Sequence, residues 1–420
     1  MRFANLKRSS FFLLTHILIA ALALIIGYRF GSGLQFSQLI GYTREAWNRQ
    51  SVRLVNTEPD ITHQQVDFAV FWETWSRLER DYYDPTKLDA QKMVDGAVAG
   101  LVSAVGDPYT VYLAPETKQR LTEDLQGEFG GVGIQLGYID GQLAVISPIK
   151  GHPAEGAGVR AGEYILRIVD TQKNVDKETI GMSAEEAVSY IRGETGTKVT
   201  LSMALAGEEP RDVELTREII EIPSLELEIL GEGNQKTAHI ILSRFGDKTV
   251  AELDAAVSQI QSDSSIRGIV LDMRGNPGGY LEAGIDVASE FIDGGLIVSQ
   301  KGRYNTLNYR STRPARLANY PVEVLVNKGS ASAAEIVAGA LRDRRQAELI
   351  GEQTFGKGSV QDAQMVGGAG AGLNITIARW LLPSGESIQD TGLPVTIEAA
   401  DDPETENDEV LDRALTELYN

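Results

Sequence analysis

The 420-residue sequence predicts a multidomain α/β protein that begins with one apolar segment. Short alternating apolar runs separated by glycine turns, typical of β-strands, fill residues 127–218. From residue 219 onward, buried strands alternate with amphipathic helices, the pattern of an α/β core. A third pattern, an apolar run at residues 11–28, predicts a signal or transmembrane segment. We therefore expect an inserted β-rich domain at residues 127–218, followed along the chain by an α/β core.

Composition narrows the classes of function. Cysteine is absent, which excludes disulfides, thiolate zinc sites and cysteine nucleophiles. Only four histidines are present, so a histidine base or a histidine-rich metal site has few candidates. The 39 basic and 59 acidic side chains give a net charge of −20, which argues against nucleic acid as a partner. We expect no cofactor and no metal.

The N-terminal segment predicts attachment to a membrane. Arg2, Lys7 and Arg8 precede the apolar run, which at about 1.5 Å per residue could span about 27 Å. No clean cleavage site follows, so residues 1–33 favour a signal anchor over a cleaved signal peptide. The basic residues then place the rest of the chain outside the cytoplasm, either membrane-anchored or, after cleavage, secreted. Residues 34–65 lack periodicity and are interpreted as a linker.

Residues 66–126 predict a small helical region. Helical spacing extends over residues 66–83 and 88–105, and a short helix is expected at residues 114–125. The first helix has an aromatic stripe that we expect to be core: Phe68, Phe71, Trp72, Trp75 and Leu78. At the other end of the chain, residues 401–420 form an acidic tail. Its apolar spacing predicts a helix that packs on the core or on a partner.

The segment 127–218 resembles a PDZ domain. It has a GGVGI glycine loop, the series SPIKGHPAEGAGVRAGEYILRIVD, and a later helix that begins at a capping box, Ser183 to Glu186. The resemblance implies that the backbone N–H groups of the loop bind the carboxylate of a substrate tail, while the adjacent sheet edge accepts an extended peptide. The loop residues are Gly131, Val132, Gly133 and Ile134.

Residues 219–400 predict an α/β core with two loops at strand ends, 275–279 and 327–331, where chemistry is expected. Ser332 follows the second loop and admits two interpretations. Either it forms a capping box with Glu335 and serves only as a helix cap, or it is a nucleophile at a helix N-terminus whose N–H groups stabilise an oxyanion.

Three motifs in order, DMRGNPGG, VLVNKGSASAAEIVAGALRD and GEQTFGKGSVQ, resemble the carboxyl-terminal processing proteases. The resemblance implies a serine endopeptidase with a crotonase-like α/β protease core, which acts on protein substrates with a free C-terminus. It assigns Ser332 as nucleophile, Lys357 as base and Gln361 as the supporting residue. The backbone N–H groups of Gly278 and Ala333 would form the oxyanion hole.

Further positions stay open at this point. Arg192 matches a position that links the PDZ domain to the active site in relatives, or it is a solvated charge at a helix end. His239 is interpreted as a packing residue. The glycine run at 367–372 is either a hairpin tip or a flap. The family's closing aspartate is missing, because the chain has Thr391-Gly392-Leu393-Pro394-Val395 there.

Rival functions were weighed against these motifs. A trypsin-like protease would need a Gly-Asn-Ser-Gly-Gly motif, which is absent. An acyl-CoA enzyme fits poorly with a signal anchor and a PDZ domain. The non-enzyme alternative is a membrane-tethered PDZ scaffold or chaperone with an inactive core. The physiological substrate, the cleavage preference and the oligomeric state are not predicted.

Overall fold

A computed structural model describes residues 67–367, 370–402, 405 and 407–419. The chain divides into two compact units, Met1–Val94 and Asp95–Asn420, with helix α4 (Ala90–Ser103) crossing the boundary. The predicted signal anchor and the whole predicted linker lie outside the described residues. Within the described ranges, no helix combines the length and hydropathy needed to cross a bilayer.

The first unit contains helix α3 (Ala69–Asp81) and a short 3₁₀ turn, η1 (Pro85–Lys87). The predicted helices are confirmed, but the predicted apolar core along α3 is wrong. Only Trp75 of the stripe is buried, while Phe68, Trp72 and Leu78 are exposed. The helical spacing is present, yet among the described residues no second layer covers that face of α3, so the stripe has little to pack against.

The β-rich domain is built from a six-stranded antiparallel sheet in the order β3-β4-β5-β7-β8, with β6 beside β5. Its strands are β3 (Ile134–Ile139), β4 (Gln142–Pro148), β5 (Tyr164–Asp170), β6 (Val175–Glu178), β7 (Lys198–Ala204) and β8 (Arg211–Thr216). Helices α6 (Pro153–Gly156) and α7 (Ala184–Ile191) cover its core. The Ser183 hydroxyl accepts the Glu186 N–H at 3.1 Å, which confirms the predicted cap of α7. This is the architecture expected of a PDZ domain.

A two-stranded ladder joins the two ends of this domain. Strand β2 (Glu128–Gly131) pairs antiparallel with β9 (Glu218–Glu221), so the chain enters and leaves side by side. Before β2, β1 (Val111–Leu113) and helix α5 (Pro115–Gln126) precede the domain. Val111 of β1 pairs with Asn374, which follows the β-rich domain in the chain. The segments before and after this domain therefore belong to one sheet, and the domain is inserted between them.

The α/β core is organised around a six-stranded sheet in the order β10-β11-β12-β15-β16-β19. Its strands are β10 (Leu225–Leu230), β11 (Lys236–Leu242), β12 (Ile266–Asp272), β15 (Val322–Val326), β16 (Leu349–Gly351) and β19 (Ile397–Glu398). All neighbours pair parallel except β10 with β11. Parallel pairing aligns the carboxyl ends of β12, β15 and β16, which places the two predicted loops at one edge.

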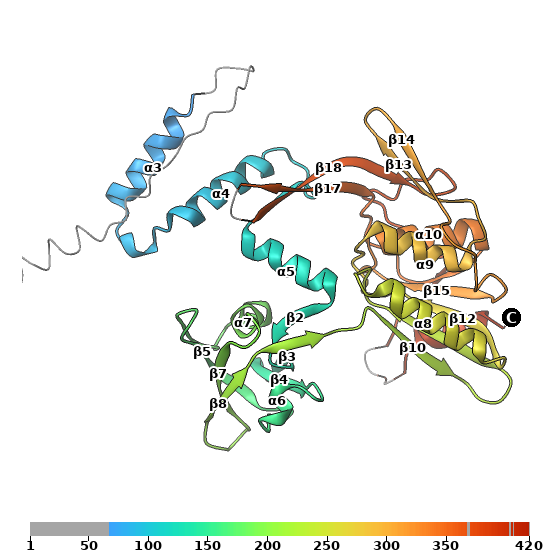
Figure 1. The fold of residues 1–420 in the computed structure, drawn as a ribbon, viewed down its shortest axis with the longest axis horizontal. Helices are drawn as coiled ribbons and strands as arrows, with labels where there is room; N and C mark the ends of the chain where they lie inside the picture. The colour runs from blue at the N-terminus through green and yellow to red at the C-terminus, as the bar shows by residue number, and fades with distance from the viewer. Residues whose placement is uncertain (1–66, 368–369, 403–404, 406, 420) are drawn as a thin grey trace, which may run out of the picture. The chain divides into compact units, whose positions relative to one another are not determined.

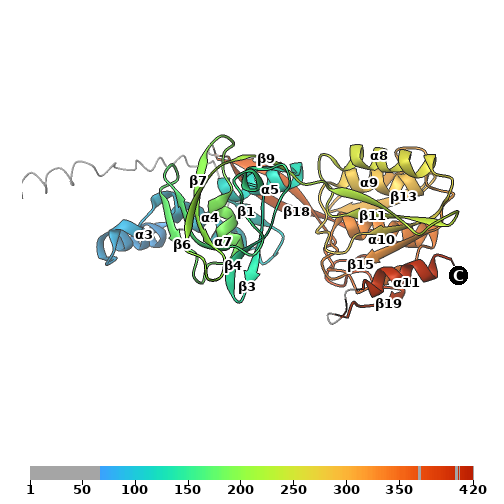
Figure 2. The ribbon, with the colours of Figure 1, turned by 90° about the horizontal axis from the view of Figure 1, so that it is seen from below.

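Helices cover both faces of this sheet. Helices α8 (Thr249–Ser262), α9 (Leu281–Phe291) and α10 (Ala333–Arg345) pack on the face that contains Ile269, Leu271 and Val324. Helix α11 (Glu409–Glu417) packs on the opposite face, against Val270 and its neighbours. Figure 2 shows α8 and α9 on one side of the sheet and α11 on the other. Burial on both faces explains the nearly continuous apolar sequence of β12.

The acidic tail therefore packs on the core, one of the two predicted alternatives. Val410, Ala414 and Leu418 of this tail are buried in a cluster with Leu325 and Ile350. Side chains at this spacing lie on one face of a helix, so the apolar pattern of the tail is explained by contacts within the chain.

A second sheet has the order β1-β18-β13-β14, with β17 on the other side of β18. Its remaining strands are β13 (Leu296–Gly302), β14 (Thr306–Arg310), β17 (Ser359–Val366) and β18 (Ala371–Leu381). Strands β17 and β18 form the hairpin seen in Figure 1, whose last pair is Val366 with Ala371, and the described glycines of the run, Gly367, Gly370 and Gly372, lie at this end of the hairpin, which fits the hairpin-tip alternative. Strand β17 begins two residues after Lys357 and brings the base segment into this sheet.

Candidate active site

Ser332 lies at the N-cap of α10, just beyond the carboxyl end of β15. Its backbone has φ 56° and ψ −114°, a sparsely populated conformation for a residue with a side chain. The residue is half-buried, so part of it is accessible to solvent. Backbone strain of this kind at the start of a helix is typical of functional positions.

The neighbouring serine of the same motif has a structural role. Ser330 is fully buried, and its hydroxyl donates to the Met273 carbonyl at 2.8 Å while accepting the Asn327 N–H at 2.9 Å. The Ser330 hydroxyl therefore links the segment after β12 to the segment after β15. Of the two serines, Ser332 is the one placed for chemistry.

The Glu335 carboxylate joins the segment of Ser332 to the segment of Lys357. It is fully buried, and one oxygen accepts the backbone N–H groups of Ser332 and Lys357, each at 2.9 Å. The other oxygen accepts the Thr354 hydroxyl at 2.6 Å and the Gly356 N–H at 2.8 Å. The capping-box bond from Glu335 to the Ser332 N–H is confirmed. The same carboxylate also positions the base, which the sequence did not reveal.

Lys357 is half-buried beside this carboxylate. Burial lowers the pKa of the Lys357 amine, and the charge of Glu335 opposes this shift only in part. The hydrogen bonds among the described residues do not include one from Ser332 to the Lys357 amine, or one from that amine to Gln361. The backbone nitrogens of Ser332 and Lys357 nevertheless donate to the same Glu335 oxygen, each at 2.9 Å, so they lie no more than about 5.8 Å apart.

Gln361 lies on β17, where the predicted shared face with Ser359 is confirmed. Its amide nitrogen donates to the Ser359 hydroxyl at 2.8 Å and to the Thr376 hydroxyl at 3.4 Å. Both N–H groups of the amide then have acceptors, which leaves the carbonyl oxygen to accept a proton donor. An acceptor without charge suits a neutral lysine amine.

The predicted oxyanion donors lie next to Ser332. A side-chain carbon built on Gly278 would lie 2.8 Å from the Ser332 Cβ and 3.1 Å from the Ala333 nitrogen, so only glycine fits here. Ala333 is the first residue of α10, and its N–H has no acceptor within the helix. The Gly278 N–H, however, donates to the Asn276 side-chain oxygen at 2.9 Å. It must exchange this acceptor before it can serve an oxyanion.

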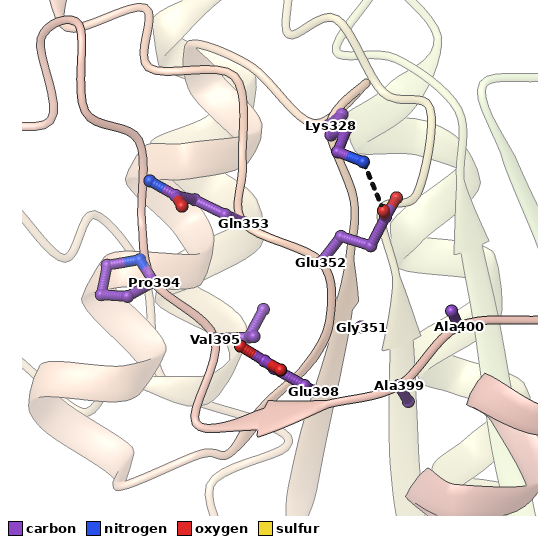
Figure 3. A pocket seen from close by; sticks show the side chains of 9 residues that line it. All are labelled: Lys328, Gly351, Glu352, Gln353, Pro394, Val395, Glu398, Ala399 and Ala400. Atoms are coloured by element: carbon purple, nitrogen blue, oxygen red, sulfur yellow. Dashed lines mark hydrogen bonds and ion pairs between the residues drawn. The ribbon is translucent and has the colours of Figure 1, made fainter.

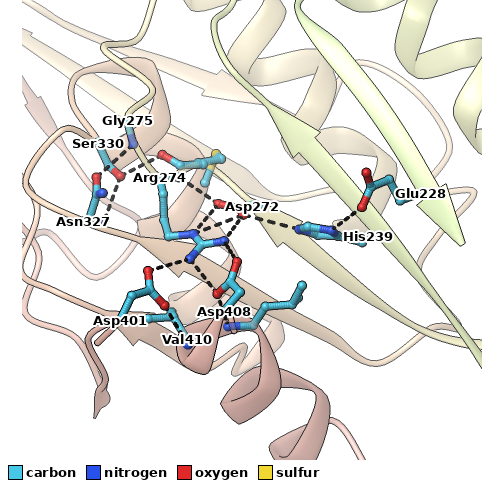
Figure 4. Close-up of polar contacts among 12 residues, drawn as sticks. Glu228, His239, Asp272, Arg274, Gly275, Asn327, Ser330, Asp401, Asp408 and Val410 are labelled. Carbon is cyan, nitrogen blue, oxygen red and sulfur yellow. Dashed lines mark hydrogen bonds and ion pairs between the residues drawn. The ribbon is translucent and has the colours of Figure 1, made fainter. Parts of the chain in front are cut away.

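A charged network holds the start of the Gly278 loop (Figure 4). Arg274 donates to buried Asp272 at 2.7 Å and to Asp408, the N-cap of α11, at 2.6 Å. Burial would raise the pKa of Asp272, but hydrogen bonds from His239 and Arg274 lower it overall. His239 lies between Asp272 and Glu228, at 3.3 and 3.4 Å. It belongs to this network, which agrees with its interpretation as a structural residue.

The glycine loop of the PDZ domain is arranged to present N–H groups. The carbonyls of Val132 and Gly133 accept the N–H groups of Ala154 and Ile149, at 2.9 and 2.8 Å, so both carbonyls are bonded within the domain. Gly133 has φ 74°, which glycine adopts without strain. Strand β3, which follows the loop, is an edge strand of its sheet. A cavity of about 80 Å³ lies between this strand and α7 and is lined by all four predicted loop residues.

Arg192 closes one end of this groove. Its guanidinium carbon lies 3.6 Å from the centre of the Phe129 ring, and its Nη1 pairs with Asp124 of α5 at 3.0 Å. Phe129 also lines the groove. Arg192 therefore connects this cavity to α5 through its contacts with Phe129 and Asp124.

A larger open cavity of about 460 Å³ lies at the ends of β16 and β19 (Figure 3). Lys328 and Glu352 pair across part of its wall at 2.7 Å. Neither Ser332 nor Lys357 lines it, so this cavity is separate from the catalytic residues.

Comparisons with known proteins identify the class of this fold. Residues 236–399 match the model of peptidase family S41, and residues 30–117 match the N-terminal domain of the activating protease CtpB. The chain is similar in fold to a putative S41 protease from Bacteroides fragilis, with a TM-score of 0.55 and 18% identity over 87% of this chain and 99% of that chain. The fold is thus that of a serine peptidase.

Sequence relatives identify the family. The carboxy-terminal-processing protease of Bartonella bacilliformis is 37% identical over 79% of this chain and 74% of the relative. The carboxy-terminal processing protease CtpA of Bacillus subtilis is 35% identical over 78% of this chain and 68% of the relative. The chain belongs to the carboxy-terminal processing proteases of peptidase family S41, and it is a serine-type peptidase.

Glu335→Gln tests the link between the two catalytic segments. An amide offers one acceptor oxygen where the carboxylate offers two, so buried donors lose their partners. We expect the variant to lose about 2 to 4 kcal/mol of unfolding free energy and most of its kcat. Denaturant unfolding and peptide hydrolysis measure the two effects. Glu352→Gln, at a partly exposed ion pair, is the control, and it should change the unfolding free energy and kcat only slightly. Wild-type kcat in Glu335→Gln would contradict this role.

Proposed function

We propose that this protein is an endopeptidase that recognises protein substrates by their C-terminal tails and cleaves them with a Ser332–Lys357–Gln361 mechanism. The observation that carries the proposal is the Glu335 carboxylate, which holds the backbone of both Ser332 and Lys357 while the Lys357 amine is buried. Membership of family S41 supports the peptidase chemistry, and the geometry supports the assignment of residues within it.

The proposed reaction begins with a neutral Lys357 amine. Lysine has a reference pKa of about 10.4, so the base is available near neutral pH only because burial lowers that pKa. Lys357 takes the proton of the Ser332 hydroxyl as its oxygen attacks the scissile carbonyl carbon. The oxyanion is stabilised by the N–H groups of Ala333 and Gly278, the latter after release from Asn276.

Collapse of the tetrahedral intermediate completes acylation. The C–N bond breaks, the protonated Lys357 gives its proton to the leaving amine, and an ester forms on Ser332. Water then attacks the ester carbonyl as Lys357 removes its proton. The C–O bond to Ser332 breaks, the protonated Lys357 gives its proton to the serine oxygen, and the carboxylic acid product leaves, which regenerates the serine. Gln361 orients the amine through its free carbonyl oxygen without adding a charge that would favour the ammonium form.

The two serines of the motif provide a matched pair of variants. Ser332→Ala should reduce cleavage of an unfolded protein by about 10³-fold or more, with an unchanged thermal transition. Lys357→Ala should have a similar effect. Ser330→Ala removes two buried hydrogen bonds, so it should lower stability by about 1 to 3 kcal/mol and retain measurable activity. The assignment would be overturned if Ser330→Ala were inactive while Ser332→Ala cleaved at the wild-type rate.

Tail recognition is proposed to occur in the PDZ groove. The loop formed by Gly131, Val132, Gly133 and Ile134 would receive the terminal carboxylate, and the edge of β3 would pair with the peptide as an added strand. Arg192 would transmit occupancy of the groove to α5 through its pair with Asp124. The groove is narrow in this structure, so ligand binding is expected to require that α7 and β3 move apart.

Substrates with free and amidated C-termini test this proposal. The wild type should prefer the free terminus, whereas Gly133→Ala, whose new methyl would meet the His152 side chain at 2.3 Å, should lose that preference. Gly141→Ala also places alanine at a positive φ, but in open space, so this variant should keep the preference for the free terminus. The Arg192→Gln variant should cleave both the free and the amidated substrate slowly. Equal cleavage of the two substrates by the wild type would exclude recognition of the tail carboxylate.

We also propose that residues 1–33 attach the protein to a membrane, with the catalytic part on the extracytoplasmic side. The support is the basic flank followed by an apolar run of spanning length. Extraction of membranes with alkaline carbonate should leave the full chain in the pellet, and protease added from outside should digest its catalytic part. Recovery in the supernatant at full length would contradict the anchor.

A further inference from the structure

The segment between α4 and β1 reaches the catalytic base although it lies outside the peptidase core at residues 236–399. This segment, residues 107–110, is Asp107-Pro108-Tyr109-Thr110. The centre of the Tyr109 ring lies 5.7 Å from the Lys357 amine nitrogen. Tyr109 is itself half-buried, so its ring occupies space beside the amine that water would otherwise fill.

Several hydrogen bonds hold this segment in place. Asp107 accepts the Tyr109 N–H at 3.1 Å and the Thr110 hydroxyl at 2.6 Å, which closes the turn on itself. The Thr110 hydroxyl oxygen also accepts the Thr376 N–H of β18 at 3.1 Å. Strand β1 continues from this turn and pairs with β18 from Val111 onward. The segment is thus attached to the sheet that holds Gln361.

The same bonds connect the segment to the supporting residue of the base. Thr376 lies opposite Gln361 in the β17–β18 ladder, and its hydroxyl accepts the Gln361 amide at 3.4 Å. The backbone of Thr376 is bonded to Thr110, and its side chain is bonded to Gln361. Residues 107–110 therefore contact the base through the Tyr109 ring and contact its supporting residue through Thr376.

We infer that Tyr109 is a positioning residue for the general base, whose ring excludes water from the Lys357 amine and so keeps that amine neutral. This inference rests on the proposed role of Lys357. It assigns part of the active site to a segment that precedes the PDZ domain in the chain.

The electrostatics around the amine agree with this role. The charged groups that act on Lys357 or on Tyr109 are Glu335 of α10, Asp390 after β18, and Asp107, and Arg379 of β18 in turn acts on Asp107. Burial raises the pKa of the Tyr109 hydroxyl, and the charges of these three carboxylates raise it further. The phenol therefore stays neutral over the working pH range. It carries no formal negative charge. The ring face attracts an ammonium at this distance, so the proposed role requires that exclusion of water outweigh this attraction.

The pH dependence of kcat/KM tests the inference. Rate rises with pH as the base loses its proton, so the acid limb reports Lys357 in the free enzyme. In Tyr109→Ala, water reaches the amine, and we expect the acid limb of kcat/KM to shift to higher pH by about one unit. At a pH below the limb, this shift lowers kcat/KM about tenfold. Activity should recover at high pH. Tyr109→Phe keeps the ring and should superimpose on the wild type, as should Tyr304→Ala, at an exposed tyrosine.

A second measurement reads the amine directly. The rate at which acetic anhydride labels Lys357 is followed against pH by mass spectrometry, with the exposed Lys328 as internal standard. Tyr109→Ala should shift this titration upward by the same amount. If that variant does not fold, Tyr109→Leu, which leaves part of the space unfilled, should shift it in the same direction by less.

The outcomes are separable from those that test the proposed function. An unshifted Lys357 titration, or a loss of rate in Tyr109→Ala that is equal at every pH, would overturn the role of Tyr109. Activity retained by Lys357→Ala would instead overturn Lys357 as the base. The labelling experiment would still report whether the Tyr109 ring excludes water from the amine.

Discussion

The active site depends on one buried carboxylate. Glu335 accepts four hydrogen bonds, from Ser332, Thr354, Gly356 and Lys357, and three of these come from backbone N–H groups. A carboxylate removed from water is stable only when its oxygens are satisfied in this way. The loops before α10 and before β17 must therefore take conformations that point their N–H groups at the same place. The geometry of nucleophile and base follows from that requirement.

The same carboxylate creates a conflict that the rest of the site resolves. A negative charge near Lys357 favours the ammonium form, whereas the proposed chemistry needs a neutral amine. Burial outweighs the charge and lowers the pKa of Lys357. Donors around Glu335 are committed to its oxygens, and the uncharged Tyr109 ring lies near the amine. In the proposed mechanism, exclusion of water from the amine therefore matters as much as which residues are present.

Much of the fold was predictable because local patterns decide it. Helix α7 begins at the predicted capping box and strand β15 ends just before the predicted loop at 327–331, since local patterns define both without reference to distant residues. The ladders β1–β18 and β2–β9 were not predicted, because they join segments far apart in the sequence. The stripe of α3 shows the converse error. Its spacing predicted a helix correctly, but spacing does not specify whether a neighbouring layer exists to bury Phe68 and Trp72.

The sequence alone determined which residue types are available: no cysteine, few histidines, and serine, lysine and glutamine in motifs that resemble a known protease family. The tertiary structure decided how they are used. It commits the Ser330 hydroxyl to two loops, leaves Ser332 at a strained helix start, and bonds the Gly278 N–H to Asn276. It also brings Tyr109 beside Lys357. Motifs specify chemistry through side-chain identity, whereas hydrogen-bond partners and exclusion of water arise only when distant segments pack together.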